Sequence, residues 1–252
     1  MKNIFSIMII TALFLGSCSE NGPTSSKEFV PNGSYNWDYS VGGLWYHVIS
    51  PATEGYTQSI VFSGGNKVSI YNADTLFFTS RYTLQGDTLF YENNHTPQIF
   101  KLSDGKLTLT DLCVDCFEHY YSSPDNVNNL IIYDHWRDLF LPDDPLDIKN
   151  VSISKDILSI DVQFGGGCED HLFDMFTASA FLESNPVQAD LKLVHNGLDD
   201  PCDALISKTV KFDLTPLKKA YITSYGNSGS IYLRISISGD STVYTPMPLY
   251  TF

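Results

Sequence analysis

The sequence predicts an all-β protein in which a small up-and-down barrel is followed by a β-sandwich. Short runs rich in Tyr, Phe, Thr, Ile and Val recur along residues 33–252, and turns containing Gly, Asn, Asp or Pro separate them. In residues 107–110, Leu alternates with Thr, which is the two-residue period of a strand with one buried face. Beyond Cys18, no stretch keeps a helical apolar period for more than about three turns. We therefore expect strands, with few helices, throughout the folded part of the chain.

Residues 33–123 are predicted to form the barrel. Apolar runs between turn signals place strands at residues 43–49, 59–62, 67–71, 75–84, 88–92, 97–102 and 106–112. About eight strands at such short spacing suit an up-and-down barrel. A barrel of about eight strands has room for side chains or for one small ligand, but not for both. We expect inward residues such as Phe62, Ile70, Leu107 and Leu109 to fill most of the interior.

An aromatic motif stands near the start of this region. The residues Gly43-Leu44-Trp45 resemble the Gly-x-Trp motif that opens the first strand of lipocalin-like barrels. The hairpins that follow, ending in KLTLTDLCVDCFEHYY, are similar to small lipocalin-like domains of exported bacterial lipoproteins. The resemblance covers residues 33–122 and implies a lipocalin-like barrel with Trp45 packed against one end. An ordinary core tryptophan at this position is the alternative.

Residues 124–146 differ in composition from the segments on either side. Segments rich in proline and acidic or amide side chains, at residues 124–126 and 141–145, flank an amphipathic piece at residues 130–140. Such clusters of turn residues mark a boundary between structural units. We therefore predict a linker between two domains here.

The remaining residues, 147–252, are predicted to form the sandwich. Seven short strands are expected at residues 148–154, 157–164, 171–179, 189–195, 205–213, 230–238 and 244–252. Seven strands with turns between them suit a β-sandwich of immunoglobulin-like type. One helical turn is expected at residues 215–220, with Thr215 as its cap and Pro216 at its first position.

The first 17 residues are predicted to be a secretory signal peptide. Lys2 gives a charged start, and the apolar run that follows is shorter than the about 20 residues of a membrane-spanning helix. The ending Leu15-Gly16-Ser17-Cys18 resembles the lipobox of bacterial lipoproteins. This resemblance implies that Cys18 is lipidated and becomes the N-terminus. Residues 18–32, which are polar and contain two prolines, are then expected to form a flexible tether.

The predicted location of the protein and its net charge exclude some classes of binding partner. In the lipoprotein family an Asp after the cysteine favours retention in the inner membrane, so Ser19 implies the outer membrane, on its periplasmic or surface face. The chain carries 29 acidic and 15 basic residues, a net charge of -14. Such acidity argues against a nucleic-acid partner, because phosphate backbones are repelled. It also disfavours electrostatic adhesion to anionic lipid, so membrane contact is expected through the lipid on Cys18.

Four cysteines remain after Cys18. In an exported protein an even number predicts disulfides, and four cysteines allow three pairings. The most economical pairing joins Cys113 with Cys116 and Cys168 with Cys202, each within its own domain. The second bridge would close a loop of about 35 residues, which stabilises a fold by on the order of 3–4 kcal/mol.

A metal site is the competing interpretation of the second pair. Cys168, His171, His195 and Cys202 offer two thiols and two imidazoles, a ligand set that zinc accepts. Loops at one rim of a sandwich could bring all four together. Oxidation of the thiols would remove this site, so the two interpretations exclude each other.

The remaining motifs do not form a catalytic constellation. Cys113-Val114-Asp115-Cys116 has the spacing of a redox motif but lacks the helix N-terminus that lowers a thiol pKa. Acidic turns at residues 143–144 and 199–203 lack the spacing of calcium loops, and we expect them to be solvated. Three glycines at residues 165–167 predict a bulge or wide turn beside Cys168.

The expected function is therefore that of a non-enzymatic binding or interaction module without a cofactor. Its partner is expected to be a protein, a glycan or a small apolar molecule. The alternative is a metal-binding protein or metal-dependent hydrolase that uses zinc at Cys168, His171, His195 and Cys202.

Overall fold

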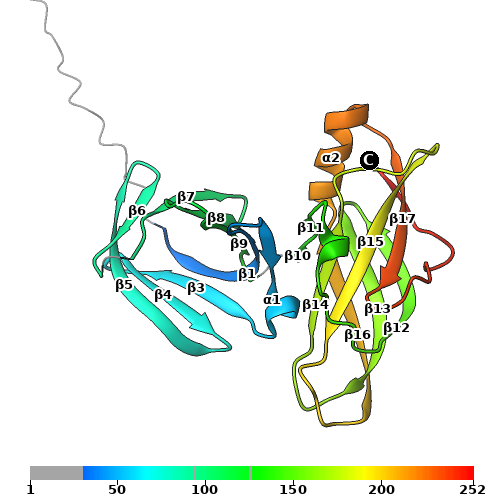
Figure 1. The fold of residues 1–252 in the computed structure, drawn as a ribbon, viewed down its shortest axis with the longest axis horizontal. Coiled ribbons are helices and arrows are strands. Elements are labelled where there is room, and N and C mark those ends of the chain that lie inside the picture. Colours follow the sequence, from blue (N-terminus) through cyan, green and yellow to red (C-terminus); the bar gives the residue numbers. More distant parts are fainter. Residues whose placement is uncertain (1–30, 94, 125–126) are drawn as a thin grey trace, which may run out of the picture. The chain divides into compact units, whose positions relative to one another are not determined.

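A closed antiparallel barrel forms the first part of the computed structural model, which describes residues 31–93, 95–124 and 127–252. Among these residues, eight strands follow one another around the ring, and pairing of the first with the last closes it (Figure 1). They are β1 (Gly33–Gly42), β3 (Gln58–Ser63), β4 (Lys67–Asn72), β5 (Thr75–Gln85), β6 (Thr88–Tyr91), β7 (Gln98–Ser103), β8 (Lys106–Asp111) and β9 (Phe117–Ser122). The all-β class and the up-and-down barrel are thus confirmed.

Two short elements follow β1 before the ring continues. The strand β2 (His47–Ile49) pairs with the end of β1, and the helix α1 (Pro51–Glu54) comes next. The predicted signal peptide, the predicted lipidation site Cys18 and almost all of the predicted tether lie outside the described residues. Lipidation at Cys18 therefore stays a prediction.

Side chains fill the interior of the barrel. Phe62, Leu107 and Leu109 are each 1% exposed and belong to one apolar cluster, against which Ile70 packs. Phe62 meets Tyr82 in an edge-on contact, with ring centroids 5.6 Å apart. All four were expected to face inwards, and for Leu107 and Leu109 the expectation came from the two-residue period. Each such side chain contributes about 1.5–3 kcal/mol on burial, so packing of the interior stabilises the ring.

Trp45 does not pack against the end of the barrel, which corrects the expectation drawn from the Gly-x-Trp motif. It lies in the turn between β1 and β2, and its side chain is 76% exposed. A Cβ atom at Gly42 would lie 2.2 Å from the carbonyl oxygen of Cys116, so only glycine lets β1 approach β9 so closely before this turn. The buried tryptophan of β1 is Trp37, whose Nε1–H donates to Ser40 Oγ at 2.8 Å.

A sandwich of two sheets forms the second part, as predicted. One sheet has the order β10-β16-β13-β12 and the other the order β11-β14-β15-β17-β18. The long strands are β12 (Asp147–Ser154), β13 (Ile157–Gly166), β14 (Leu172–Thr177), β15 (Val187–Asn196), β16 (Ala204–Asp213) and β17 (Ser230–Ile237), with the short β18 (Leu249–Thr251) at one edge. Residues predicted as the linker supply β10 (Asn128–Asn129) and β11 (Ile131–Ile132), one strand to each sheet.

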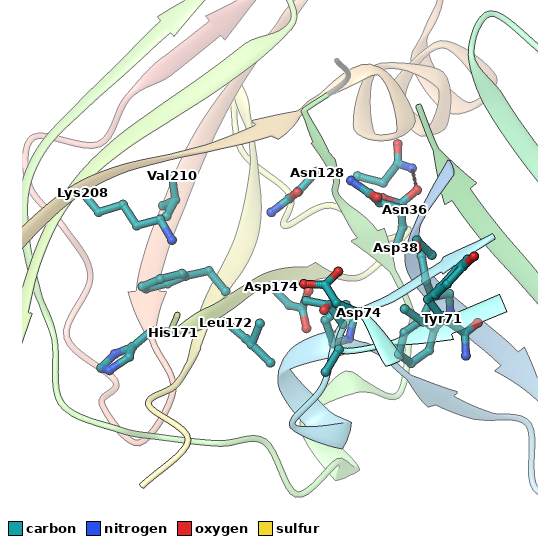
Figure 2. Close-up of a pocket in the computed structure, with 18 residues that line it drawn as sticks. Asn36, Asp38, Tyr71, Asp74, Asn128, His171, Leu172, Asp174, Lys208 and Val210 are labelled. Atoms are coloured by element: carbon teal, nitrogen blue, oxygen red, sulfur yellow. Dashed lines mark hydrogen bonds between the residues drawn. The ribbon is translucent and has the colours of Figure 1, made fainter. Parts of the chain in front are cut away.

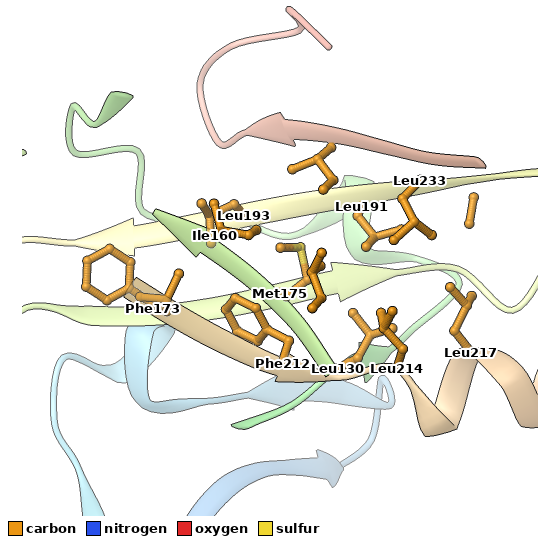
Figure 3. Packing of buried hydrophobic residues seen from close by; sticks show 14 of the residues in the cluster. Leu130, Ile160, Phe173, Met175, Leu191, Leu193, Phe212, Leu214, Leu217 and Leu233 are labelled. Atoms are coloured by element: carbon orange, nitrogen blue, oxygen red, sulfur yellow. The ribbon is translucent and has the colours of Figure 1, made fainter. Parts of the chain in front are cut away.

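The core of the sandwich lies between its two sheets (Figure 3). Ile160 and Phe212 come from one sheet, and Met175, Leu191 and Leu193 come from the other. All five are fully buried, at 0% exposure. This continuous apolar layer explains why the inner positions of β13 alternate strictly with exposed or half-buried ones.

The helix α2 (Thr215–Tyr225) connects β16 to β17 and is longer than the single turn expected there. Pro216 lies in its first turn as predicted, but Leu214 rather than Thr215 occupies the N-cap position. Asp213 Oδ1 accepts the backbone N–H of Thr215 at 2.8 Å, which satisfies one of the free donors at the helix start. A 3-10 helix, η1 (Trp136–Asp138), lies earlier in the chain. No helix in the described part of the chain is long and apolar enough to cross a bilayer.

Candidate functional site

A polar pocket of about 360 Å³ is lined by residues of both the barrel and the sandwich. In Figure 2, Asn36 and Asp38 lie on one side of it and Lys208 on the other, with Asp174 between them. This volume falls within the range of about 300–1,000 Å³ that small-molecule sites occupy. The pocket is therefore a candidate binding site, although sequence reasoning did not single out these residues.

The first strand directs two polar groups into the pocket. Trp37 points into the barrel, so its neighbours Asn36 and Asp38 point outwards, as the two-residue period requires. The pairing of β1 with β9 shifts register between Trp37 and Tyr39, which leaves Asp38 as the extra residue of a β-bulge. Bulges re-aim side chains and are frequent beside binding sites. In the sequence, this wall of the pocket could have been recognised from the alternation of polar and aromatic residues in Asn-Trp-Asp-Tyr, residues 36–39.

Asp38 is a hydrogen-bonded carboxyl group in this wall. Its Oδ2 accepts hydrogen bonds from Ser122 Oγ at 2.7 Å and from Asn129 Nδ2 at 2.5 Å. Burial raises the pKa of Asp38 to about 7, a rise that these two hydrogen bonds and the charge of Lys106 only partly oppose. The nearby charge of Asp174 raises it further. The carboxyl group can therefore both accept and donate a hydrogen bond near neutral pH.

Asp174 supplies a second buried carboxyl group, from β14. It is 6% exposed, and its Oδ2 accepts the backbone N–H of Ala52, in the first turn of α1, at 2.8 Å. Burial raises the pKa of Asp174 to about 6, against the lowering effect of hydrogen bonds from Ser50 and Ala52. This contact also ties the segment after β2 to the sandwich.

Three further side chains leave donors and acceptors available to a ligand. Within the described residues, the side-chain amides of Asn36 and Asn128 and the ammonium of Lys208 have no hydrogen-bond partner. The ammonium of Lys208 lies 5.2 Å from the centre of the Phe173 ring, a cation–π contact that holds it at the pocket wall. The pocket thus combines free amide groups, the carboxyl groups of Asp38, Asp74 and Asp174, and the ammonium of Lys208.

The predicted cysteine pairs lie at disulfide distance. The Cα atoms of Cys113 and Cys116 are 5.5 Å apart, and those of Cys168 and Cys202 are 5.8 Å apart. Both separations lie within the range for a bridge. Cys113 and Cys116 close the turn between β8 and β9, where a redox motif would need a helix start.

The two histidines of the predicted metal site are hydrogen-bonded to each other. The Nδ1 atom of His171 lies 2.8 Å from Nε2 of His195. The outer nitrogens are also engaged, because His195 Nδ1 lies 3.0 Å from the carbonyl oxygen of Asp144 and His171 Nε2 lies 3.1 Å from Asp200 Oδ2. The ring nitrogens of both histidines are thus engaged in hydrogen bonds and are not free to bind a metal in this arrangement. Cys168 lies at disulfide distance from Cys202.

The carbonyl oxygen at one end of this hydrogen-bonded chain sets the direction of its hydrogen bonds. A carbonyl oxygen only accepts, so His195 donates from Nδ1 to Asp144, and its Nε2, when the ring is neutral, accepts. His171 then donates from Nδ1 to His195 Nε2, and its own Nε2 lies against Asp200 Oδ2. Burial lowers the pKa of His195, and the neighbouring charge of His171 lowers it further, so His195 stays neutral.

Asp200 is not in a solvated acidic turn, which corrects the expectation for residues 199–203. Its side chain is 2% exposed, and its Oδ2 accepts the backbone N–H groups of Gly167, Cys168 and Glu169 at 2.8, 3.0 and 3.0 Å. Oδ1 accepts the N–H of Cys202 at 2.8 Å. Burial alone would raise the pKa of Asp200, but these four hydrogen bonds outweigh it and hold the pKa well below the usual value.

The glycines before Cys168 make this arrangement possible. A Cβ atom at Gly166 would lie 2.5 Å from His171 Nε2 and 2.9 Å from Asp200 Oδ2, so a larger residue would displace the ion pair. Gly166 also has a φ of 151°, which other residues rarely adopt. His171 lines the pocket as well, so this network supports one of its walls.

Comparisons with known proteins give weak likenesses. No protein-family model and no curated protein matches the chain. Solved structures to which it is similar include a NigD-like immunity protein from Bacteroides caccae, at 15% identity over 88% of this chain and 99% of that one, with a TM-score of 0.36. A protein of unknown function from Bacteroides vulgatus matches at 14% identity over 69% of this chain and 87% of that one, with a TM-score of 0.31. A candidate lipoprotein from Bacteroides fragilis matches at 12% identity over 76% of this chain and 93% of that one, with a TM-score of 0.32. Values this low do not establish a common function.

Proposed function

We propose that this protein is a lipid-anchored, non-enzymatic binding module of the cell envelope. Its ligand site is the pocket of Figure 2, and the ligand is a small hydroxyl-rich molecule such as the end of a glycan. The single observation that supports this proposal most is the set of unpaired amide groups beside buried carboxyl groups in one cavity.

The chemistry of the pocket fits hydroxyl groups best among the expected partners. Each hydroxyl both donates and accepts a hydrogen bond, and amide side chains such as Asn36 and Asn128 offer both complements. Asp38, with a pKa of about 7, can also take either role. The aromatic side chain of Tyr71 also lines the cavity and provides apolar surface for the face of a sugar ring. A small apolar molecule would leave these polar groups without partners, which costs binding free energy.

The anchoring part of the proposal rests on the N-terminal sequence. The lipobox-like ending at Cys18 supports lipidation, and Ser19 after it supports the outer membrane. The closed eight-stranded barrel is compatible with the lipocalin-like relationship that residues 33–122 imply, even though Trp45 does not close its end. Lipid on Cys18 would hold the pocket near the membrane while residues 18–32 give it reach.

A ligand panel tests the pocket directly. The full mature protein in non-ionic detergent is titrated with neutral mono- and disaccharides, and binding is followed by saturation-transfer NMR and calorimetry. We expect at least one saccharide to bind, with an affinity that falls at least tenfold in Asn36→Ala/Asn128→Ala. The matched control Asn150→Ala/Asn227→Ala removes two amides outside the pocket and should bind as the wild type does.

Two outcomes would overturn the proposal. Absence of saccharide binding, or equal binding by both double variants, would remove the pocket as a glycan site. Release of new reducing ends from the saccharides would show that the protein hydrolyses them, and the non-enzymatic part would then be wrong.

A further inference from the structure

A second cavity, of about 850 Å³, shares only Asn129 with the lining of the first one. Its walls come from the β7–β8 hairpin, the β12–β13 turn, the start of α2 and part of β9. The proposed function assigns no ligand to this cavity.

Lysine side chains gather around the second cavity. Lys101 and Lys106 come from the β7–β8 hairpin, Lys155 from the β12–β13 turn and Lys219 from α2. The whole chain has only 15 Lys and Arg residues and a net charge of -14. Four of these cations around one cavity therefore create a local charge opposite to that of the protein as a whole.

Most of the carboxylates at this cavity are already engaged. Asp213 forms an ion pair with Lys106. Asp156 accepts a hydrogen bond from Tyr250 at 2.6 Å and pairs with Lys218, which lies 3.3 Å away. Asp104 remains, and it accepts a hydrogen bond from a neighbouring serine at 3.0 Å.

Three of the lysines carry a positive charge that no ion pair within the described residues neutralises. In the described ranges of the chain, Lys101, Lys155 and Lys219 form no ion pair and no side-chain hydrogen bond. Like charges collected on facing walls repel one another, and a bound anion would remove this repulsion. Each of the three stands on a different wall of the cavity, so no single carboxylate of the chain can neutralise them all.

The rest of the lining suits an organic anion rather than a bare ion. Tyr39 and Tyr120 stack with ring centroids 4.4 Å apart and form an aromatic wall. Thr108 and Thr215 also line the cavity, and threonine hydroxyl groups can donate to oxyanions. A cavity of about 850 Å³ is also much larger than one phosphate or sulfate needs, since sites of this size hold drug-sized ligands.

We infer that this second cavity binds a small organic anion that carries two or more oxyanion groups, either phosphoryl or carboxylate. Lys101, Lys155 and Lys219 each meet part of its charge, while Tyr39 and Tyr120 contact its body. Because the lysines stand on separate walls, an anion with several charged groups binds more tightly than one with a single group.

Calorimetry with defined anions tests this inference. The full mature protein is titrated with pyrophosphate and citrate, and with inorganic phosphate and sulfate as single-group controls. We expect pyrophosphate or citrate to bind at least tenfold more tightly than the single-group anions, and to bind more weakly as salt rises. Preference for pyrophosphate assigns phosphoryl groups, preference for citrate assigns carboxylates, and equal binding of both supports recognition of charge number alone.

Matched variants locate the site. Lys101→Gln/Lys155→Gln/Lys219→Gln should weaken binding at least tenfold, whereas Lys67→Gln/Lys149→Gln/Lys211→Gln, with the same change in net charge, should alter it less than threefold. Far-UV circular dichroism checks that both triple variants fold, and the single variant of each cavity lysine should show a smaller loss in the same direction. Equal losses in the two triple variants, or no binding of pyrophosphate and citrate to the wild type, would overturn the inference.

Discussion

The Nε2 atom of His171 lies 3.1 Å from Oδ2 of Asp200, and the two side chains are 3% and 2% exposed. This contact joins the start of β14 to the loop between β15 and β16. The same carboxylate accepts hydrogen bonds from the backbone N–H groups of both Cys168 and Cys202. The buried carboxylate of Asp200 thus contacts three of the four residues that the sequence predicted as alternative metal ligands, namely Cys168, His171 and Cys202.

We predict that Asp200→Asn lowers the melting temperature clearly more than Asp203→Asn, its exposed neighbour. An amide has only one acceptor oxygen, so some of the four backbone N–H groups would lose their partner, and the contact of Asp200 with His171 would be weakened. The pKa of Asp200 is depressed, so its contribution is present above about pH 4, the ordinary carboxyl range, and is lost as the pH falls through its lower folded value. Thermal unfolding at pH 7 and pH 3 measures both effects, and equal melting temperatures of the two variants at pH 7 would contradict the prediction.

Asp38 should have the opposite dependence on pH. Its pKa is raised to about 7 in the folded protein, so the unfolded state ionises first and the free energy of unfolding falls as pH rises from about 4 to 7. A difference of about three pKa units sets an upper limit of about 4 kcal/mol on this loss. Asp38→Asn keeps an acceptor for Ser122 and Asn129, and we expect it to stabilise the protein at pH 8 but not at pH 4.

Urea unfolding at the two pH values measures the effect of Asp38→Asn, with Asp203→Asn as the exposed control. A destabilised Asp38→Asn protein at pH 8 would mean that the ionised carboxylate contributes favourably, contrary to the raised pKa.

The Cys168–Cys202 pair should form a disulfide that stabilises the sandwich. The two residues are 34 positions apart in the chain, and closing a loop of this size contributes on the order of 3–4 kcal/mol. Non-reducing peptide mapping should find them linked, and Cys168→Ala/Cys202→Ala should lower stability more than Cys113→Ala/Cys116→Ala, whose loop is far shorter. Free thiols together with one equivalent of co-purified zinc would instead favour the metal site, and His171→Ala should then lose the metal.

Trp37 and Trp45 should differ in their contributions to stability. Trp37 is 6% exposed and Trp45 is 76% exposed. Trp37→Ala should therefore cost about 3–5 kcal/mol, the usual loss for a buried aromatic side chain, whereas Trp45→Ala should change stability by less than about 0.5 kcal/mol. Chemical denaturation compares the two, and equal losses would show that Trp45 is buried after all.

The lipid anchor is predicted at Cys18. Cys18→Ala should abolish labelling by a fatty-acid analogue and release the protein from membranes, because the lipid supplies the strong apolar anchor. Cys113→Ala should keep its label. Label on the Cys18→Ala protein would place the lipid elsewhere.

Most of the strands and the inward side chains could be predicted because their signals are local. Alternation along β8 placed Leu107 and Leu109 inside the barrel, and turn residues marked the hairpins. Prediction failed where a distant segment decides the outcome. Trp45 belongs to a motif but is exposed, in a turn that follows Gly42, where the backbone of Cys116, just before β9, approaches too closely for any larger residue.

The candidate site shows the same division between local and distant effects. The sequence by itself determined the all-β class, the barrel with further sheets after it, and the acidic charge, because these follow from period, composition and spacing. Only the tertiary structure decided that Asp38 and Asp174 line one pocket and that Asp200 is buried. Burial and hydrogen bonding change what a carboxyl group does, and both depend on strands that lie far apart in the chain.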